Sequence, residues 1–256
     1  MKLFYRTYGE GKPLVILHGL YGISDNWVTH ARALSEKYQV IIPDLRNHGQ
    51  SPHSSVFNYN AMTEDVRELL EDLEIESCLL IGHSMGGKLA MNLALENSEV
   101  VEKLIVVDMS PKRYYLREFH NKLMDAMMHL DFTQLKSRKE VEDALKMPIP
   151  DDRIRQFIMK NLHWTETKSL SWRMNLPSIL ENIDYVFDAI EGHTTFMNPA
   201  LFIRGGKSDY VTDADFPLIF QKFPFAEIKT IPQAGHWVQV DQPDDFLMLV
   251  NDFLGD

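Results

Sequence analysis

Short runs of apolar residues, bounded by glycine, proline and aspartate, recur along the first half of the chain and return near its end. The early runs are continuously apolar and do not alternate, which is typical of parallel strands covered on both faces. The predicted strands are residues 14–17, 40–42, 79–81, 104–107, 201–203 and 227–231.

Helical patterns separate these predicted strands. In residues 62–73, Met62, Val66 and Leu69 follow a spacing of three to four residues, and acidic residues fill the opposite face. A similar pattern closes the chain over residues 246–253. This alternation of strands and helices predicts an α/β fold with a mostly parallel, doubly wound sheet.

Residues 111–199 follow a different pattern, with several helical segments, punctuating prolines and no strand-like apolar run. A helical block between two strands of one sheet is most simply an insertion that caps the carboxyl edge of the sheet. We therefore expect a sheet domain of residues 1–110 and 200–256 and a helical cap of residues 111–199. The helices predicted in the cap are residues 119–130, 141–147, 154–162 and 179–190.

The composition narrows the class of protein. The 256 residues include a single cysteine, Cys78, which excludes a disulfide framework and a cysteine-based metal site. The formal net charge of −11 disfavours a nucleic-acid surface, and no apolar run approaches the roughly 18 residues of a membrane span. We therefore expect a cytoplasmic protein that acts on a small molecule, with no membrane span and no nucleic-acid partner.

A candidate nucleophile lies in the segment Gly82-His83-Ser84-Met85-Gly86-Gly87, between a predicted strand and the helical residues 88–94. This is the G-x-S-x-G pattern in the strand–turn–helix setting that it requires. Glycines are needed because neighbours with a Cβ would collide with the tight turn or with the adjoining strand. The turn lifts the hydroxyl of Ser84 clear of the backbone, beside the positive end of the helix, where a base can reach it.

A second glycine-rich segment, Leu17-His18-Gly19-Leu20-Tyr21-Gly22, follows the first predicted strand. A His-Gly turn at this place presents a backbone amide toward the nucleophile. We expect the amides of Leu20 and Met85 to bind the oxyanion of a tetrahedral intermediate, a contribution of about 3 kcal/mol per donor. The side chain of His18 is interpreted as a packed core histidine.

The candidate general base is His236, in Gly235-His236-Trp237 after the last predicted strand. Of the ten histidines, only His236 lies in a glycine-flanked loop just past a strand, where catalytic groups gather. Two aspartates keep the chain order Ser, Asp, His: Asp108, which directly ends a strand, and Asp209, in a later loop. A carboxylate after four buried apolar residues is costly unless it is paired, and an imidazolium is a good partner.

These motifs make the sequence resemble the α/β-hydrolase family over nearly its whole length. The matching segments are His18-Gly19, residues 44–51 (DLRNHGQS), residues 82–87 and Gly235-His236-Trp237. The Arg-Asn-His-Gly form of the second segment is a narrower feature. Together with Val107-Asp108, residues 172–176 (WRMNL) and residues 205–208 (GGKS), it resembles small bacterial esterases of the YbfF type and their eukaryotic relatives in the ABHD group.

The resemblance bears on the choice of the acid. The usual family spacing after the later strand is G-x-x-D, but here the fourth residue is Ser208, and Asp209 comes one residue late. The narrower resemblance implies an acid after the earlier strand and a serine that takes part at the later position. We therefore expect a triad of Ser84, His236 and Asp108, with Ser208 as an auxiliary hydrogen-bonding residue near His236. Asp209 is the alternative acid.

The expected reaction is acyl transfer from a carboxylic ester or an acyl-CoA thioester through an acyl-enzyme on Ser84, with no metal and no cofactor. Candidate substrate contacts in the cap are Arg113, Arg173 and Asn175. The basic residues among positions 112–122 would suit an anionic leaving group such as coenzyme A, although a solvated helix face explains them equally well. Seven of the 13 methionines lie in the cap; they would suit variable acyl chains, although core filling explains each one alone.

Two alternatives stay open at this point. One is another chemistry on the same fold, such as carbon–carbon bond hydrolysis, a lyase reaction or a haloperoxidase-like reaction, because similar serine turns occur in those enzymes. The other is a ligand-binding relative whose triad turns over weakly or not at all.

Overall fold

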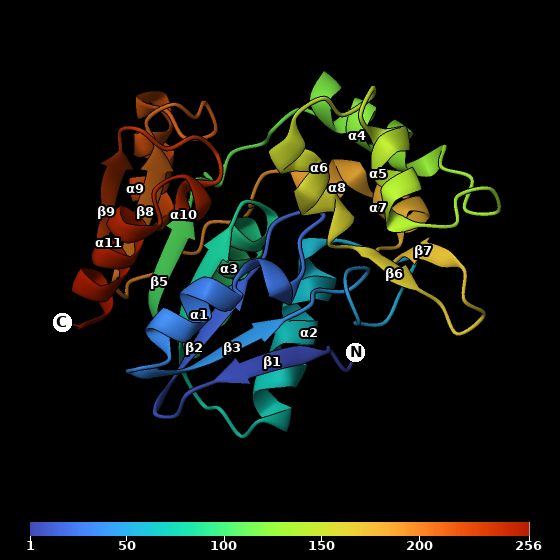
Figure 1. Cartoon of the computed structure of the whole chain (residues 1–256). Coiled ribbons are helices and arrows are strands. Elements are labelled where there is room, and N and C mark those ends of the chain that lie inside the picture. The colour runs from blue at the N-terminus through green and yellow to red at the C-terminus, as the bar shows by residue number, and fades with distance from the viewer. Residues whose placement is uncertain (256) are drawn as a thin grey trace.

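The structure is a computed structural model that describes residues 1–255, and it is built around one seven-stranded sheet (Figure 1). The strands are β1 (Tyr5–Tyr8), β2 (Lys12–Leu17), β3 (Tyr38–Pro43), β4 (Cys78–His83), β5 (Val101–Val107), β8 (Ala200–Gly205) and β9 (Ala226–Ile231). They lie in the order β1-β3-β2-β4-β5-β8-β9, with β1 antiparallel to β3 and the other neighbours parallel. The predicted α/β fold with a mostly parallel sheet is confirmed.

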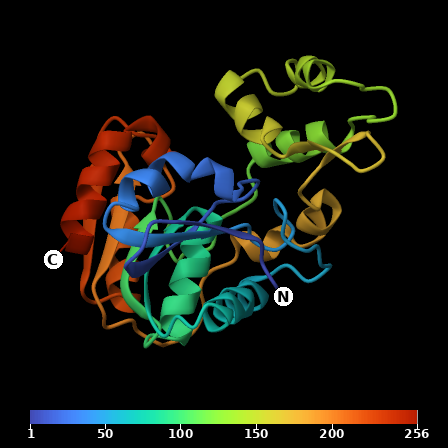
Figure 2. The same ribbon diagram turned by 60° about the horizontal axis from the view of Figure 1, so that its bottom comes forward.

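Helices cover both faces of the sheet. The helices of this part are η1 (Ser24–Asn26), α1 (Val28–Leu34), α2 (Tyr59–Asp72), α3 (Met85–Glu96), η2 (Asp213–Asp215), α9 (Phe216–Lys222), α10 (Val238–Asp241) and α11 (Pro243–Gly255). In β2, Leu14 and Ile16 belong to a core shared with α1 and α11, whereas Val15 and Leu17 belong to a core shared with α2 and α3. This two-sided burial explains why the strand is continuously apolar, and Figure 2 shows the two helical layers.

Most of the segment between β5 and β8, residues 111–199, stands apart from the sheet in both views (Figures 1 and 2), while its end returns to the sheet, where Asn198 donates to the carbonyl oxygen of Val101 in β5. Its elements are α4 (Glu118–Met128), α5 (Arg138–Leu145), α6 (Asp152–Met159), β6 (Leu162–Trp164), β7 (Leu170–Trp172), α7 (Leu176–Glu181) and α8 (Ile183–Phe187). Helices occur in all four predicted places. The antiparallel hairpin of β6 and β7 was not predicted, because three-residue strands are too short to show a strand pattern. Residue 162, placed at the end of a helix by the sequence pattern, begins β6 instead.

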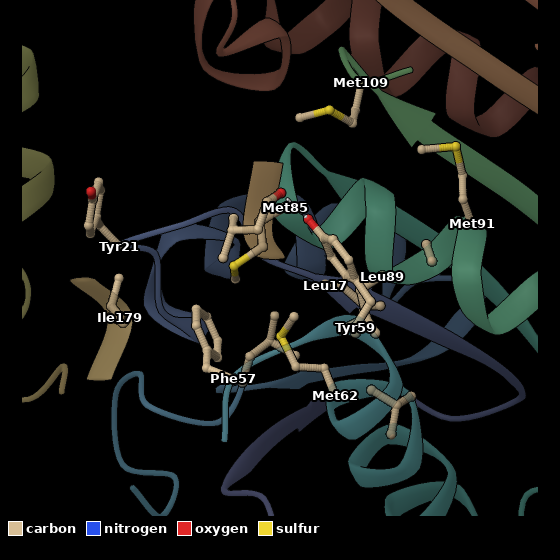
Figure 3. Close-up of a cluster of buried hydrophobic side chains, with 14 of the residues drawn as sticks. Leu17, Tyr21, Phe57, Tyr59, Met62, Met85, Leu89, Met91, Met109 and Ile179 are labelled. Carbon is tan, nitrogen blue, oxygen red and sulfur yellow. Dashed lines mark hydrogen bonds between the residues drawn. The ribbon is translucent and has the colours of Figure 1, made fainter. Parts of the chain in front are cut away.

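The larger core joins this segment to the sheet. Figure 3 shows Leu17 of β2, Tyr59 of α2 and Ile179 of α7 in one cluster of buried side chains. The hydroxyl of Tyr59 also donates to the carbonyl oxygen of Val186 in α8, at 2.7 Å. Residues 111–199 therefore pack against the α2 side of the sheet, in addition to being joined to β5 and β8 through the chain.

The candidate site residues gather at one edge of the sheet. His18, Ser84 and Asp108 directly follow β2, β4 and β5, while Ser208 and His236 lie in the loops after β8 and β9. Parallel neighbouring strands end at the same edge, which brings these loops together. Within residues 1–255, no helix has the length and apolar character that a membrane crossing requires.

Candidate active site

Ser84 occupies a sharp turn between β4 and α3. Its backbone has φ 54° and ψ −120°, a positive-φ conformation that is strained for a residue with a Cβ. A Cβ on Gly82 would lie 2.2 Å from the carbonyl oxygen of Gly86, and one on Gly86 would lie 2.3 Å from that of Leu17. The turn is therefore folded tightly on itself and against β2, so neither glycine position accepts a larger residue.

His236 contacts both Ser84 and Asp108. Its Nε2 lies 3.0 Å from Oγ of Ser84, and its Nδ1 lies 2.8 Å from Oδ2 of Asp108. Because a carboxylate oxygen accepts hydrogen bonds, Nδ1 carries the proton, and Nε2 is free to accept from the serine hydroxyl. This arrangement places a hydroxyl next to a base, and an acid orients that base.

Asp108 is completely buried at the end of β5, with φ 49°. Its Oδ1 accepts from the backbone N–H of Gly205 at 3.0 Å, and its Oδ2 accepts from the hydroxyl of Ser208 and from His236. Three donors thus satisfy a carboxylate whose burial would otherwise be costly. Ser208 was expected beside His236; its hydroxyl donates to Asp108, so it touches the same carboxylate as the histidine.

Asp209 points away from this arrangement. Its side chain is 74% exposed, and its Oδ1 accepts a hydrogen bond from Arg117 at 2.8 Å. The structure therefore brings Asp108, and not Asp209, to His236. The shift of one residue along the loop is enough to turn the second carboxylate to the surface.

The loop after β2 approaches Ser84 closely, since a Cβ on Gly19 would lie 3.2 Å from the Cβ of Ser84. Leu20 and Met85, whose amides were predicted to bind an oxyanion, line one small cavity together with Ser84. Within the described residues, neither amide donates a hydrogen bond to another protein group. Two unused donors therefore lie near the serine, as binding of a substrate oxygen requires.

Two buried histidines support this loop. Nε2 of His18 accepts from the N–H of Leu45 at 3.0 Å, and Nε2 of His48 accepts from the N–H of Tyr21 at 3.2 Å. Burial lowers the pKa of His18 to about 4 and the pKa of His48 to about 3. Both rings are therefore neutral at pH 7, as an accepting nitrogen requires, and His18 is the packed core residue that was predicted.

These two histidines predict a loss of stability in acid. In the unfolded chain they have an ordinary pKa near 6.5, so below that pH the unfolded state binds more protons than the folded state. We expect the free energy of unfolding to fall between pH 6.5 and about 4, by about 1 kcal/mol per pH unit for each histidine. Urea denaturation at pH 7, 6 and 5 measures the slope. His48→Gln should flatten it, and exposed His129→Gln should not; equal slopes in these two variants would contradict the prediction.

A cavity of about 610 Å³ opens beside Ser84 and His236. Residues of α4 and α6, such as Leu123 and Phe157, form part of its wall, and loops of the sheet form the rest. This size suits a small organic substrate. Within residues 1–255, no three His, Cys, Asp or Glu side chains are placed to hold a metal ion.

The three predicted substrate contacts do not line this cavity. Among the described residues, its wall does not include Arg113, Arg173 or Asn175. Asn175 instead caps α7, and its backbone N–H donates to the carbonyl oxygen of Asn47 at 2.9 Å. The basic residues 112–122 are each paired with an acid, in the pairs Lys112–Asp215, Arg113–Asp188, Arg117–Asp209 and Lys122–Glu118.

The methionines of residues 111–199 do not line the cavity either, so of the two explanations given above core filling is favoured over a pocket for acyl chains. Core packing explains the spacing of the buried members, and the remaining members lie at the surface. The buried methionines are Met124, Met127, Met159 and Met174, and the exposed ones are Met128, Met147 and Met197.

Two residues that the sequence analysis did not assign to the site contact His236. His83 donates from Nε2 to the carbonyl oxygen of His236 at 2.9 Å, and burial lowers the pKa of His83 to about 3. The ring of Tyr210 stacks on the imidazole, with 3.7 Å between the ring centroids and 17° between the planes. No periodic pattern marks either residue, and the only sequence signal is position: His83 ends β4 directly before Ser84, and Tyr210 lies in the loop after β8.

Comparison with known proteins agrees with this fold. The family model described as alpha/beta hydrolase fold matches residues 12–143. The sn-1-specific diacylglycerol lipase ABHD11 of Danio rerio is 39% identical over 252 residues, which cover 96% of this chain and 79% of that protein. The esterase YbfF of Escherichia coli (strain K12) is 33% identical over 247 residues, which cover 96% of this chain and 94% of that protein.

A solved structure of a marine microorganism esterase is also similar, with 41% identity and a TM-score of 0.96 over 98% of this chain and 99% of that chain. The resemblance predicted from the sequence motifs is therefore confirmed. This chain belongs to the α/β-hydrolase family.

Proposed function

We propose that this chain is a serine esterase that hydrolyses carboxylic esters through an acyl-enzyme on Ser84. The observation that carries the proposal is the connected series Ser84–His236–Asp108, with contacts of 3.0 and 2.8 Å, beside a cavity of about 610 Å³. The names of the relatives, which are esterases and a lipase, support an ester as the substrate.

In the first half of the proposed reaction, Oγ of Ser84 attacks the ester carbonyl carbon while Nε2 of His236 takes the hydroxyl proton. Asp108 holds Nδ1 protonated and stabilises the imidazolium that forms. The carbonyl oxygen becomes an oxyanion, for which the amides of Leu20 and Met85 are the proposed donors. His236 then gives its proton to the leaving alkoxide, and Ser84 keeps the acyl group.

In the second half, water attacks the acyl-enzyme while Nε2 of His236 removes one of its protons. The same two amides bind the second oxyanion. When this intermediate collapses, His236 returns the proton to Oγ of Ser84, and the carboxylic acid leaves. His236 acts as base or acid in every step, according to whether Nε2 is protonated. The proposed reaction therefore uses only the residues named above, the ester and water.

Residues 111–199 act as a cap in this proposal, because α4 and α6 close part of the cavity over Ser84. A thioester would follow the same steps with a thiol as the leaving group. The basic residues that would attract coenzyme A are paired with acids, however, so the surface charge does not favour an acyl-CoA over an ester.

A scan over p-nitrophenyl esters and acyl-CoA thioesters of increasing chain length tests the proposal. We expect ester hydrolysis with kcat in the usual enzyme range, about 1–10³ s⁻¹. A fluorophosphonate should attach one label to each protein molecule, and the added mass should lie on the peptide that contains Ser84. Ser35→Ala, at a partly buried position at the end of α1, is the matched control and should label normally.

The outcomes separate the proposal from its alternatives. Labelling of Ser84 without turnover of any ester or thioester would indicate a ligand-binding relative or another reaction on this fold. Hydrolysis without labelling of Ser84 would contradict the acyl-enzyme mechanism.

A further inference from the structure

The face of the His236 imidazole is covered by an aromatic ring. Tyr210 lies nearly parallel to it, at 3.7 Å between centroids, and is itself only 9% exposed. The two nitrogens of His236 point in the ring plane toward Ser84 and Asp108. The stacked ring therefore restrains the imidazole without competing for either hydrogen bond.

Three residues from the segment 111–199 hold Tyr210. The hydroxyl of Tyr114 donates to the carbonyl oxygen of Tyr210 at 2.7 Å, and Nε2 of His120 lies 3.3 Å from the Tyr210 hydroxyl. The guanidinium of Arg117 lies over the Tyr210 ring, 4.5 Å from its centroid. Each contact comes from the segment that closes the cavity, so the position of Tyr210 depends on that segment.

Tyr210 is also connected to Asp108 by hydrogen bonds through Ser208. Its backbone N–H donates to Oγ of Ser208 at 3.2 Å, and that hydroxyl donates to Asp108. Next to it, Asp209 accepts from Arg117 at 2.8 Å. Asp209 therefore holds the guanidinium of Arg117 over the ring of Tyr210. Through that ring, the loop after β8 contacts His236.

From this geometry we infer that Tyr210 is a positioning residue through which residues 111–199 set the orientation of His236. The inference rests on the proposed function. Rotation of the imidazole about its bond to Cβ would break its contacts with Ser84 and Asp108 together, and the parallel ring of Tyr210 blocks that rotation. Arg117 and Asp209 act one step further out, because they hold the tyrosine ring and do not touch His236.

The test replaces the ring and then restores it. Tyr210→Leu is expected to lower kcat for a p-nitrophenyl ester about 10- to 100-fold, as small misplacements of catalytic groups do, with KM changed less. Tyr210→Phe keeps the stacked ring and should retain kcat within about threefold. Tyr38→Leu, the same change at another buried tyrosine far from the site, is the matched control and should leave kcat unchanged.

A spectroscopic measurement separates positioning from general damage. In proton NMR, the Nδ1–H of His236 should give a downfield resonance in the native protein and in Tyr210→Phe, and a broadened or absent one in Tyr210→Leu. Arg117→Met, at a half-exposed position, should lower kcat more modestly, and it should add no loss when combined with Tyr210→Leu.

A folded Tyr210→Leu protein with native kcat and a native resonance would overturn the inference, as would a loss in Tyr210→Phe as large as in Tyr210→Leu. If Tyr210→Leu does not fold, Arg117→Met decides, because native kcat in that variant would remove the link to residues 111–199. A native protein that hydrolyses no ester would overturn the proposed function instead, and the NMR comparison would still report on the ring.

Discussion

Replacing Asp108 with asparagine is expected to lower kcat about 10⁴-fold, whereas Asp209→Asn should retain kcat within a few-fold. Asparagine has nearly the shape of aspartate, but its amide nitrogen is a donor. If that group faces Nδ1 of His236, the imidazole must carry its proton on Nε2, and Nε2 then no longer accepts from Ser84. The base would be lost while the fold of the site is kept.

The comparison of the two asparagine variants decides which aspartate is the acid. Initial rates with one p-nitrophenyl ester, at equal concentrations of folded protein, are sufficient for this measurement. Asp209→Asn removes the charge that holds Arg117 over the ring of Tyr210, so we expect a small loss of kcat. A loss near 10⁴-fold in Asp209→Asn, with Asp108→Asn close to native, would show that this assignment of the acid is wrong.

The sheet was predictable because its strands are buried on both faces. Residues 79–81 and 104–107 are apolar without interruption; they form the centre of β4 and the second half of β5. Hydrophobic burial on this scale leaves a pattern in the chain itself. The hairpin of β6 and β7 leaves none, since each strand has three residues and its pairing depends on contacts distant in sequence.

The proximity of Ser84 and His236 was predictable for a related reason. Each follows a strand in a glycine-containing loop, and parallel topology carries such loops to one edge. The choice between Asp108 and Asp209 depends on a finer property, the direction of one side chain. The backbone of Asp108 turns to φ 49° directly after the strand, which aims its carboxylate at His236.

The substrate contacts were the least predictable part of the site. Helical spacing of methionines is the same whether they face a core or a cavity, and here the buried ones face the core. Tyr210 carries no such pattern, because its contacts with His236 and Arg117 join three separate parts of the chain. Only the folded chain brings these groups together.

Ser84→Ala should cause the largest loss, about 10⁶-fold in kcat, because it removes the atom that forms the acyl-enzyme. Alanine keeps a Cβ at the same positive φ, so the strain of the turn is unchanged, and we expect the free energy of unfolding to stay within about 0.5 kcal/mol of the native value. The measurement is single-turnover hydrolysis at protein concentrations above the substrate concentration, which makes so slow a rate measurable.

His236→Ala provides the second half of this experiment. Nucleophile and base act as one unit, so the double variant Ser84→Ala/His236→Ala should be no slower than Ser84→Ala alone. Additive losses would mean that His236 still serves a reaction in which Ser84 takes no part, such as direct activation of water. A Ser84→Ala protein within 100-fold of native kcat would support the same conclusion. The absence of additivity is therefore the result that ties the hydroxyl and the imidazole, 3.0 Å apart, to one chemical step.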